Sequence, residues 1–220
     1  MSEKNSVTIE DYLEIIFVLQ RDKKQVVGAR LADLLGVTPP TVTNTLKRMA
    51  RDGLVTFNDA QGTLLTEQGL ETAKTVMRRH MLSEWMLMRM LKVPWSLTHA
   101  EAHNIEHAVS EEIEKQMRTN LGDPKTCPHG NPLPGYEYVA VNWTPLSEIL
   151  PGETVVIRRV HEMGENQPEL LNFLEENGII PGTTVQVTEV LPFNQTLSLK
   201  VKGRTISVGF STAAFIFVEK

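Results

Sequence analysis

Residues 29–53 read ARLADLLGVTPPTVTNTLKRMARDG and predict two helices joined by a tight turn. The helix over residues 29–35 ends at Gly36, since glycine readily adopts the left-handed conformation that closes a helix. The next helix begins at Pro39-Pro40, because proline is tolerated in a first helical turn. Its apolar positions, spaced so that they share one face, are Val42, Leu46 and Met49.

The elements on either side of this pair extend the pattern. A helix with Thr8 as its N-cap is predicted before it, up to about Arg21. After it, two β-prone runs, 54–57 and 63–65, are separated by the turn residues 58–62, which predicts a β-hairpin. This order of elements outlines a winged helix-turn-helix, so we expect a DNA-binding domain over residues 1–72.

The second helix of such a motif presents its first residues to base edges in the major groove. Small polar side chains there can contact bases, and basic side chains that follow can meet phosphates. The residues expected to contact DNA are Thr38, Pro40, Thr41, Thr43, Asn44, Lys47, Arg48 and Arg51. These residues could equally begin an ordinary helix, but the complete order of elements favours DNA binding.

Charge is distributed unevenly along the 220 residues, whose formal net charge is −5. Residues 1–79 carry 11 basic and 10 acidic side chains, whereas residues 80–150 carry 5 and 9, together with five of the six histidines. One part therefore suits phosphate and another suits a cation. The single cysteine excludes an intrachain disulfide framework, and no apolar run is long enough to span a membrane, so we expect a soluble, cytoplasmic protein.

The middle of the chain is predicted to be helical. Thr66 can cap a helix to about Lys92, and its second half, 81–91, is apolar on more than one face, which a partner subunit would cover. The capping-box pattern of residues 98–101 predicts a further helix to about Asn120. We expect a helical dimerisation and metal-binding domain over residues 73–124 and a proline-rich linker over residues 125–145.

From residue 146 onward the pattern changes to short strands. Five are predicted, over residues 154–160, 184–190, 196–201, 204–208 and 214–218, with one helix over residues 168–177. Five short strands within about 70 residues suggest a small β-barrel over residues 146–220. The chain as a whole is thus predicted to be a multidomain α+β protein.

Metal-ligating side chains concentrate in the helical part. If residues 98–120 form one α-helix, four side chains share about a third of its circumference, namely His99, His103, Glu106 and His107. Three imidazoles and a carboxylate make a poor core and a good ligand set. Further candidates are His80 with Glu84, Cys127 with His129, and Asp11 with Glu14 on the first helix.

Residues 103–107 also match the H-x-x-E-H pattern of some zinc peptidases, in which Glu106 would act as a general base. Five residues are a weak pattern, and the upstream winged helix and the small size of the chain argue against a hydrolase. We therefore expect no enzymatic activity. Carboxylates and imidazoles favour Mn²⁺ or Fe²⁺, although affinity alone would favour zinc or copper.

With these elements in order, the chain resembles the DtxR/MntR family of metal-dependent repressors over nearly its whole length. The stretches that carry the resemblance are residues 8–16, 40–43, 49–55, 65–69, 77–80, 101–107 and 130–134. The resemblance implies a winged helix, a helical dimerisation and metal-binding domain, and a C-terminal SH3-like domain related to FeoA.

The resemblance also implies two metal sites per subunit. Asp11, His103, Glu106 and His107 fall on the primary site, where Glu14 matches a further carboxylate of manganese-type members. His80, Glu84 and His99 fall on the ancillary site, to which Cys127 and His129 match additional ligands of some members. His103 departs from the family, since iron-type members have Cys there and manganese-type members usually Glu. Glu165 and Gln167 are the nearest candidates for a ligand from the C-terminal domain.

These observations predict a homodimeric transcriptional repressor that is activated by Mn²⁺, binds a palindromic site in double-stranded DNA and controls metal-ion homeostasis genes. An iron-dependent repressor of the same family is the first alternative. A metal-independent winged-helix regulator and a zinc hydrolase are the others.

Overall fold

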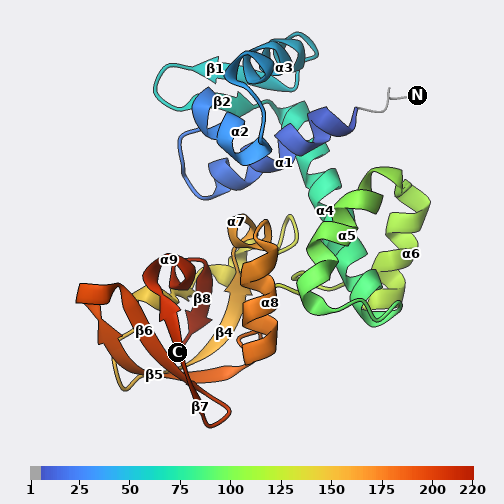
Figure 1. Cartoon of the computed structure of the whole chain (residues 1–220). Coiled ribbons are helices and arrows are strands. Elements are labelled where there is room, and N and C mark those ends of the chain that lie inside the picture. The colour runs from blue at the N-terminus through green and yellow to red at the C-terminus, as the bar shows by residue number, and fades with distance from the viewer. Residues whose placement is uncertain (1–5) are drawn as a thin grey trace. The chain divides into compact units, whose positions relative to one another are not determined.

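The chain divides into two compact units, one that extends to Arg79 and one that begins at His80. Figure 1 labels their helices and strands. The structure is a computed structural model that describes residues 6–220. The division falls within helix α4 (Glu67–Arg89), so this helix contributes to both units. None of the helices among the described residues is both long and apolar enough to cross a membrane.

The first unit has the predicted order of elements. Before α4 it contains α1 (Val7–Arg21), α2 (Gly28–Leu35), α3 (Pro39–Arg51), β1 (Val55–Asn58) and β2 (Gly62–Leu65). Gly36 ends α2 with a φ of 63°, and β1 pairs antiparallel with β2. The predicted cap of the first helix was wrong, because α1 begins at Val7 and Thr8 lies inside it. Thr66 does cap α4, since its hydroxyl accepts a hydrogen bond from the Gly69 backbone at 3.0 Å.

The helical part of the second unit differs from the single long helix predicted over residues 98–120. It contains the end of α4, then η1 (Trp95–Leu97), α5 (Thr98–Ile105), η2 (Glu106–Ala108) and α6 (Glu111–Leu121). The capping box is absent, because Thr98 is already helical and its hydroxyl donates to the Trp95 carbonyl at 2.9 Å. Val109 is extended, and Ser110 accepts a hydrogen bond from the Ile113 backbone and so caps a new helix.

The C-terminal part contains one six-stranded antiparallel sheet in the order β3-β8-β4-β5-β6-β7. Its strands are β3 (Thr144–Pro145), β4 (Thr154–Val160), β5 (Thr184–Leu191), β6 (Thr196–Val201), β7 (Arg204–Gly209) and β8 (Ile216–Glu219). The predicted barrel is not closed, since β3 and β7 are the two edges of the sheet among the described residues. The remaining helices are η3 (Glu137–Ala140), η4 (Leu146–Glu148), α7 (Glu162–Glu165), α8 (Pro168–Asn177), η5 (Pro192–Asn194) and α9 (Phe210–Ala213).

The segment predicted as a proline-rich linker, 125–145, is packed against this sheet. Residues 127–134 are buried, and the His129 carbonyl accepts a hydrogen bond from the Val160 backbone at 2.8 Å. Gly130 has a φ of 91°, and a Cβ there would lie 1.9 Å from the Arg158 carbonyl oxygen. Only glycine fits this close approach, which holds the Cys-Pro-His turn beside β4.

Candidate metal centres and DNA-binding face

A first cluster gathers around the buried carboxylate of Glu106, at the junction of α5 and η2. Oε1 of Glu106 lies 3.1 Å from His103 Nδ1 and 3.2 Å from His107 Nε2. The donor atoms of these three residues lie within 4.8 Å of one another, a spacing that could hold a metal ion. Asp11 and Glu14, the other candidates for the primary site, lie on α1 in the first unit.

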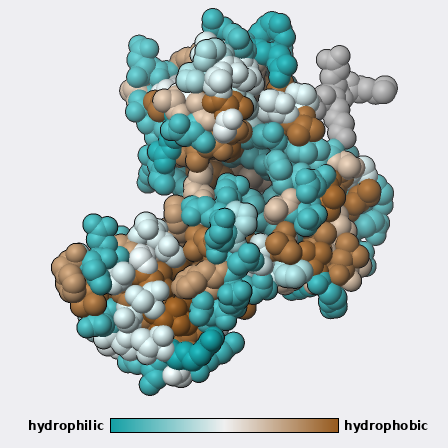
Figure 2. All heavy atoms as spheres, in the orientation of Figure 1, coloured by the Kyte–Doolittle hydropathy of each residue, from teal (hydrophilic) through white to brown (hydrophobic). Residues whose placement is uncertain are grey.

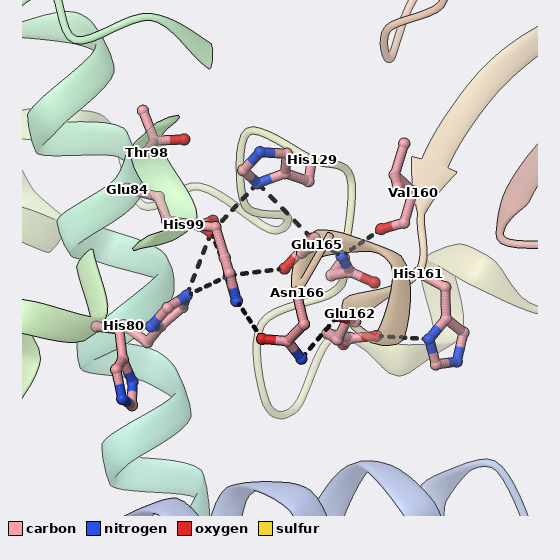
Figure 3. Close-up of polar contacts among 12 residues, drawn as sticks. His80, Glu84, Thr98, His99, His129, Val160, His161, Glu162, Glu165 and Asn166 are labelled. Atoms are coloured by element: carbon pink, nitrogen blue, oxygen red, sulfur yellow. Dashed lines mark hydrogen bonds and ion pairs between the residues drawn. The ribbon is translucent and has the colours of Figure 1, made fainter. Parts of the chain in front are cut away.

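A second cluster is formed by His80 and Glu84 on α4, His99 on α5 and Glu165 on α7 (Figure 3). Helical spacing predicted that His99 shares one face with His103, Glu106 and His107, whereas the family resemblance placed it with His80 and Glu84. The structure brings His99 beside His80 and Glu84, and the helix that was predicted to carry all of 98–120 ends at Ile105. The second cluster thus combines side chains from the helical part and from the C-terminal part of the same unit.

The geometry of the second cluster fits a metal ion. Glu84 Oε1, His80 Nε2 and His99 Nδ1 form a triangle with sides of 3.0, 3.2 and 3.3 Å. Ligand atoms that bind one ion at about 2.1 Å and at right angles lie about 3.0 Å apart. The two imidazole nitrogens face each other at 3.0 Å, so they cannot both hold a proton along that line. A cation bound between the two nitrogens would accept a lone pair from each of them.

Cys127 and His129 approach the same carboxylates. His129 Nδ1 lies 3.2 Å from Glu84 Oε1 and 3.7 Å from Glu165 Oε1. The donor atoms of Cys127, His129, Glu84 and Glu165 also lie within 4.8 Å of one another, and all four residues are buried. The candidate ancillary ligands are therefore gathered in one place. Gln167 is exposed, just before α8, and is in neither cluster.

A layer of polar residues that the sequence analysis did not single out positions Glu165. The side-chain amide of Asn131 donates to Glu165 Oε1 and, at 2.7 Å, to the Val160 carbonyl. The guanidinium group of Arg159 donates to the side-chain oxygen of Asn131, Oδ1, and, at 2.7 Å, to the carboxylate of Glu162. Asn131 and Arg159 therefore hold the orientation of Glu165, as the hydrogen-bond partners of metal-ligating side chains do in metal sites.

Histidines compensate the negative charge of the buried carboxylates in both clusters. Burial alone would raise the pKa of Glu106, but hydrogen bonds from His103 and His80 lower it to about 2. Burial alone would lower the pKa of His99, but hydrogen bonds to Glu165 and Glu84 raise it to about 10. The ion pairs of Glu84 and Glu106 in the described chain are all with histidines. A divalent cation could take over this compensation when the imidazoles lose their protons.

The predicted recognition helix, α3, keeps one polar face exposed. All eight residues predicted to contact DNA are exposed, whereas Val42, Thr45, Leu46 and Met49 are buried on the other face. Thr38 caps the helix by accepting a hydrogen bond from the Thr41 backbone at 3.4 Å. The Thr43 hydroxyl donates to the Pro39 carbonyl at 3.0 Å, which leaves its methyl group for other contacts.

An apolar surface remains uncovered on the helical part of the second unit, where Figure 2 shows a group of brown atoms around α4–α6. The apolar residues that line a hollow there are Met86, Met90, Ile113, Met117 and Leu121. Met90 and Ile113 are exposed, at 63% and 47% of their accessible surface. Exposed apolar surface of this kind makes the hollow a candidate interaction site.

An exposed recognition helix in one unit and histidine–carboxylate clusters in the other define the class of metal-binding transcription regulators. Family models agree along the chain. The N-terminal DNA-binding domain of iron-dependent repressors matches residues 5–63, their metal-binding and dimerisation domain matches residues 66–135, and the FeoA domain matches residues 144–220. The chain belongs to the DtxR family of metal-dependent transcriptional repressors, which are DNA-binding proteins rather than enzymes.

Individual relatives cover nearly the whole chain. The iron-dependent repressor IdeR of Mycobacterium tuberculosis is 34% identical over 211 residues, 87% of this chain and 92% of the relative. A solved manganese-dependent transcriptional repressor in complex with manganese has a TM-score of 0.82 at 30% identity and covers 96% of this chain and 98% of its own. IdeR of T. acidophilum has a TM-score of 0.77 at 31% identity, with 98% and 99% covered. The family resemblance seen in the sequence is confirmed.

Proposed function

We propose that this repressor acts in the cytoplasm as a homodimer, that Mn²⁺ activates it to bind a palindromic operator, and that it controls genes of metal-ion homeostasis. The exposed polar face of α3 supports the DNA contact, and the uncovered apolar hollow around Ile113 supports dimerisation. The observation that carries the metal dependence is the second cluster, where three donor atoms form a triangle of the size that one ion requires.

In this proposal the primary site consists of Asp11, His103, Glu106 and His107, with Glu14 as an adjoining carboxylate. The ancillary site consists of His80, Glu84 and His99, with Cys127 and His129 nearby and Glu165 as the ligand from the FeoA domain. The domain limits remain those proposed from the sequence, at residues 1–72, 73–124, 125–145 and 146–220.

The proposed mechanism is a linkage between two binding events. A bound divalent cation supplies positive charge that compensates carboxylates which would otherwise repel one another. Asp11 comes from the DNA-binding unit and His103, Glu106 and His107 from the other unit, so a shared ligand set restrains the recognition helix relative to the dimer domain. Metal and DNA then raise each other's affinity by the same factor.

Asp11, Glu106 and the histidines offer oxygen and nitrogen without sulfur at the primary site, which suits both Mn²⁺ and Fe²⁺. Mn²⁺ is preferred because Glu14 matches a carboxylate ligand of manganese-type members. The relatives include proteins described as iron-dependent and as manganese-dependent. Fe²⁺ is therefore the second candidate, because the imidazole of His103 stands where manganese-type members usually have a Glu.

A gel-shift titration on a palindromic promoter fragment tests the proposal, with Mn²⁺, with Fe²⁺ under anaerobic conditions, and with a chelator. We expect Mn²⁺ to raise DNA affinity by at least tenfold and Asp11→Ala to abolish this gain, whereas Asp59→Ala, in the exposed hairpin turn, leaves it unchanged. Equal DNA affinity in chelator and in Mn²⁺ would identify a metal-independent regulator.

A further inference from the structure

The helical part and the C-terminal part of the second unit share one hydrophobic core through Trp95. This residue begins η1, in the helical part, but it belongs to a cluster of buried apolar residues that otherwise comes from residues 146–218. Only 7% of Trp95 is exposed, and its Nε1 donates a hydrogen bond to the Pro128 carbonyl at 3.0 Å. Because a buried tryptophan removes a large apolar area from water, its insertion favours attachment of the two parts.

A carboxylate of the C-terminal part holds the backbone at the same point. Glu175 on α8 accepts a hydrogen bond from the Trp95 backbone with Oε1, at 3.0 Å, and one from the Ser96 backbone with Oε2, at 3.2 Å. The first N–H groups of a helical segment have no partner within it, so they need an acceptor from elsewhere. Hydrogen bonds to an ionised carboxylate are about twice as strong as neutral ones. We call this pair of hydrogen bonds, together with the buried Trp95 side chain, the latch.

The latch joins the two segments that carry facing ligands of the second cluster. Trp95 lies about one helical turn before His99. Glu175 lies on α8, which is separated by only two residues from α7 and its Glu165. Across the cluster, His99 Nδ1 lies 3.1 Å from Glu165 Oε2. Neither Trp95 nor Glu175 is a proposed metal ligand, so the latch can form before a cation binds.

We propose that Glu175 is a positioning residue that keeps the C-terminal part docked on the helical part before metal binds, so that Glu165 already faces His99. The inference rests on the proposed ancillary site and adds how that site is assembled. The apparent affinity of a site is its intrinsic affinity multiplied by the fraction of protein in the binding-competent state. With the latch intact this fraction is close to one. When the latch is broken the fraction falls, and metal then promotes docking by the factor by which the loss of docking weakens metal binding.

Acrylamide quenching of Trp95 fluorescence measures docking, because undocking exposes this side chain to solvent. The full-length chain has three tryptophans, so the other two are replaced, as Trp85→Phe and Trp143→Phe. In this background we expect Trp95 to be as protected in chelator as in Mn²⁺. Glu175→Ala should increase quenching in chelator, and Mn²⁺ should reverse the increase. Glu176→Ala, which removes an exposed charge from the same helix, is the matched control and should change neither value.

Calorimetry measures the consequence for metal binding. Glu175→Ala should lower Mn²⁺ affinity at the second cluster about tenfold, which corresponds to a docked fraction of about one tenth, and should leave the first cluster unchanged. Glu175→Gln keeps one acceptor oxygen for the two N–H groups, so its affinity should lie between those of Glu175→Ala and the wild type. Circular dichroism in chelator verifies that each variant is folded.

Two results would overturn the proposal. If wild-type Trp95 is quenched in chelator like an exposed indole and is protected only in Mn²⁺, metal itself drives docking. If Glu175→Ala lowers the melting temperature but changes neither quenching nor Mn²⁺ affinity, Glu175 only caps η1. Quenching in chelator requires neither bound metal nor DNA, so it still tests the latch if the proposed metal-dependent function fails.

Discussion

Nδ1 of His80 contacts Oε2 of Glu106, and this contact joins the two metal clusters. The other ring nitrogen, Nε2, faces Glu84 and His99 in the second cluster. A metal-ligating histidine normally donates its second N–H to a carboxylate, which fixes the orientation of both groups. One imidazole therefore orients Glu106 for the first cluster while it offers a ligand to the second.

Replacing His80 should weaken metal binding at both clusters, but to a degree that depends on the replacement. His80→Ala removes the ligand and the contact with Glu106, so we expect affinity to fall about 10- to 100-fold at the first cluster. His80→Asn places an amide near the position of Nδ1 and should restore part of that loss, while the second cluster stays impaired. Isothermal titration with Mn²⁺ measures both affinities. Equal first-cluster affinity in wild type and His80→Ala would contradict this role.

Asn131 should act as a positioning residue for Glu165. Its amide donates to Glu165 and its carbonyl oxygen accepts from buried Arg159, so Asn131→Ala leaves Glu165 free to turn. We expect metal affinity at the second cluster to fall about 10-fold or more while the first cluster is unchanged. Asn194→Ala, on the exposed surface of the same C-terminal part, is the matched control. A loss of thermal stability without a change in metal affinity would assign Asn131 a structural role alone.

The DNA-binding unit was predictable because local residues decide it. Gly36 ends α2, Pro39 begins α3, and short-range turn chemistry produces the hairpin, so little depends on distant contacts. The polar face of α3 followed from the spacing of its apolar residues.

The strands of the C-terminal part were also located from the sequence. Their closure into a barrel was not borne out. Closure depends on whether the two edge strands pair with each other, and no single segment of the sequence encodes that pairing.

The division of ligands between the clusters was not predictable from helical spacing. The angular argument assumed an unbroken helix through His99 and His107, but α5 ends at Ile105 and Ser110 starts a new helix. Glu165 lies on α7, a helix of four residues that is too short to show periodicity. Its position depends on Asn131, which is 34 residues away in sequence, so the sequence named Glu165 only as one of two candidates and could not separate it from Gln167.

Metal binding at the second cluster should release protons. Without metal, the pKa of His99 is raised to about 10, so the imidazole is protonated at pH 7 and a cation must displace its proton. Affinity should therefore rise with pH between about 6 and 8, by up to tenfold per pH unit for each proton released. Calorimetry at pH 7 in buffers of different ionisation enthalpy counts these protons, and His99→Gln should release about one fewer. The same count in both proteins would show that His99 is neutral before metal binds.

Lys47 should contribute to DNA affinity without reading sequence. It is exposed on α3 beyond the residues expected to face the bases. Lys47→Ala should weaken binding about equally on all sequences and lower the slope of log affinity against log salt by about 1. Lys200→Ala removes an exposed charge from the C-terminal sheet and should change neither quantity. A loss confined to one operator sequence would instead assign Lys47 to base contact.

The apolar hollow around Ile113 should be the contact between two copies of this chain. Ile113 is 47% exposed beside Met86, Met90 and Met117, so a charge placed there would be buried on dimerisation without a partner. We expect Ile113→Arg to shift the protein from dimer to monomer in sedimentation experiments and to weaken operator binding in Mn²⁺. Phe193→Arg alters a residue that is 85% exposed on the C-terminal part and should leave the dimer intact. A dimeric Ile113→Arg variant would place the interface on another surface.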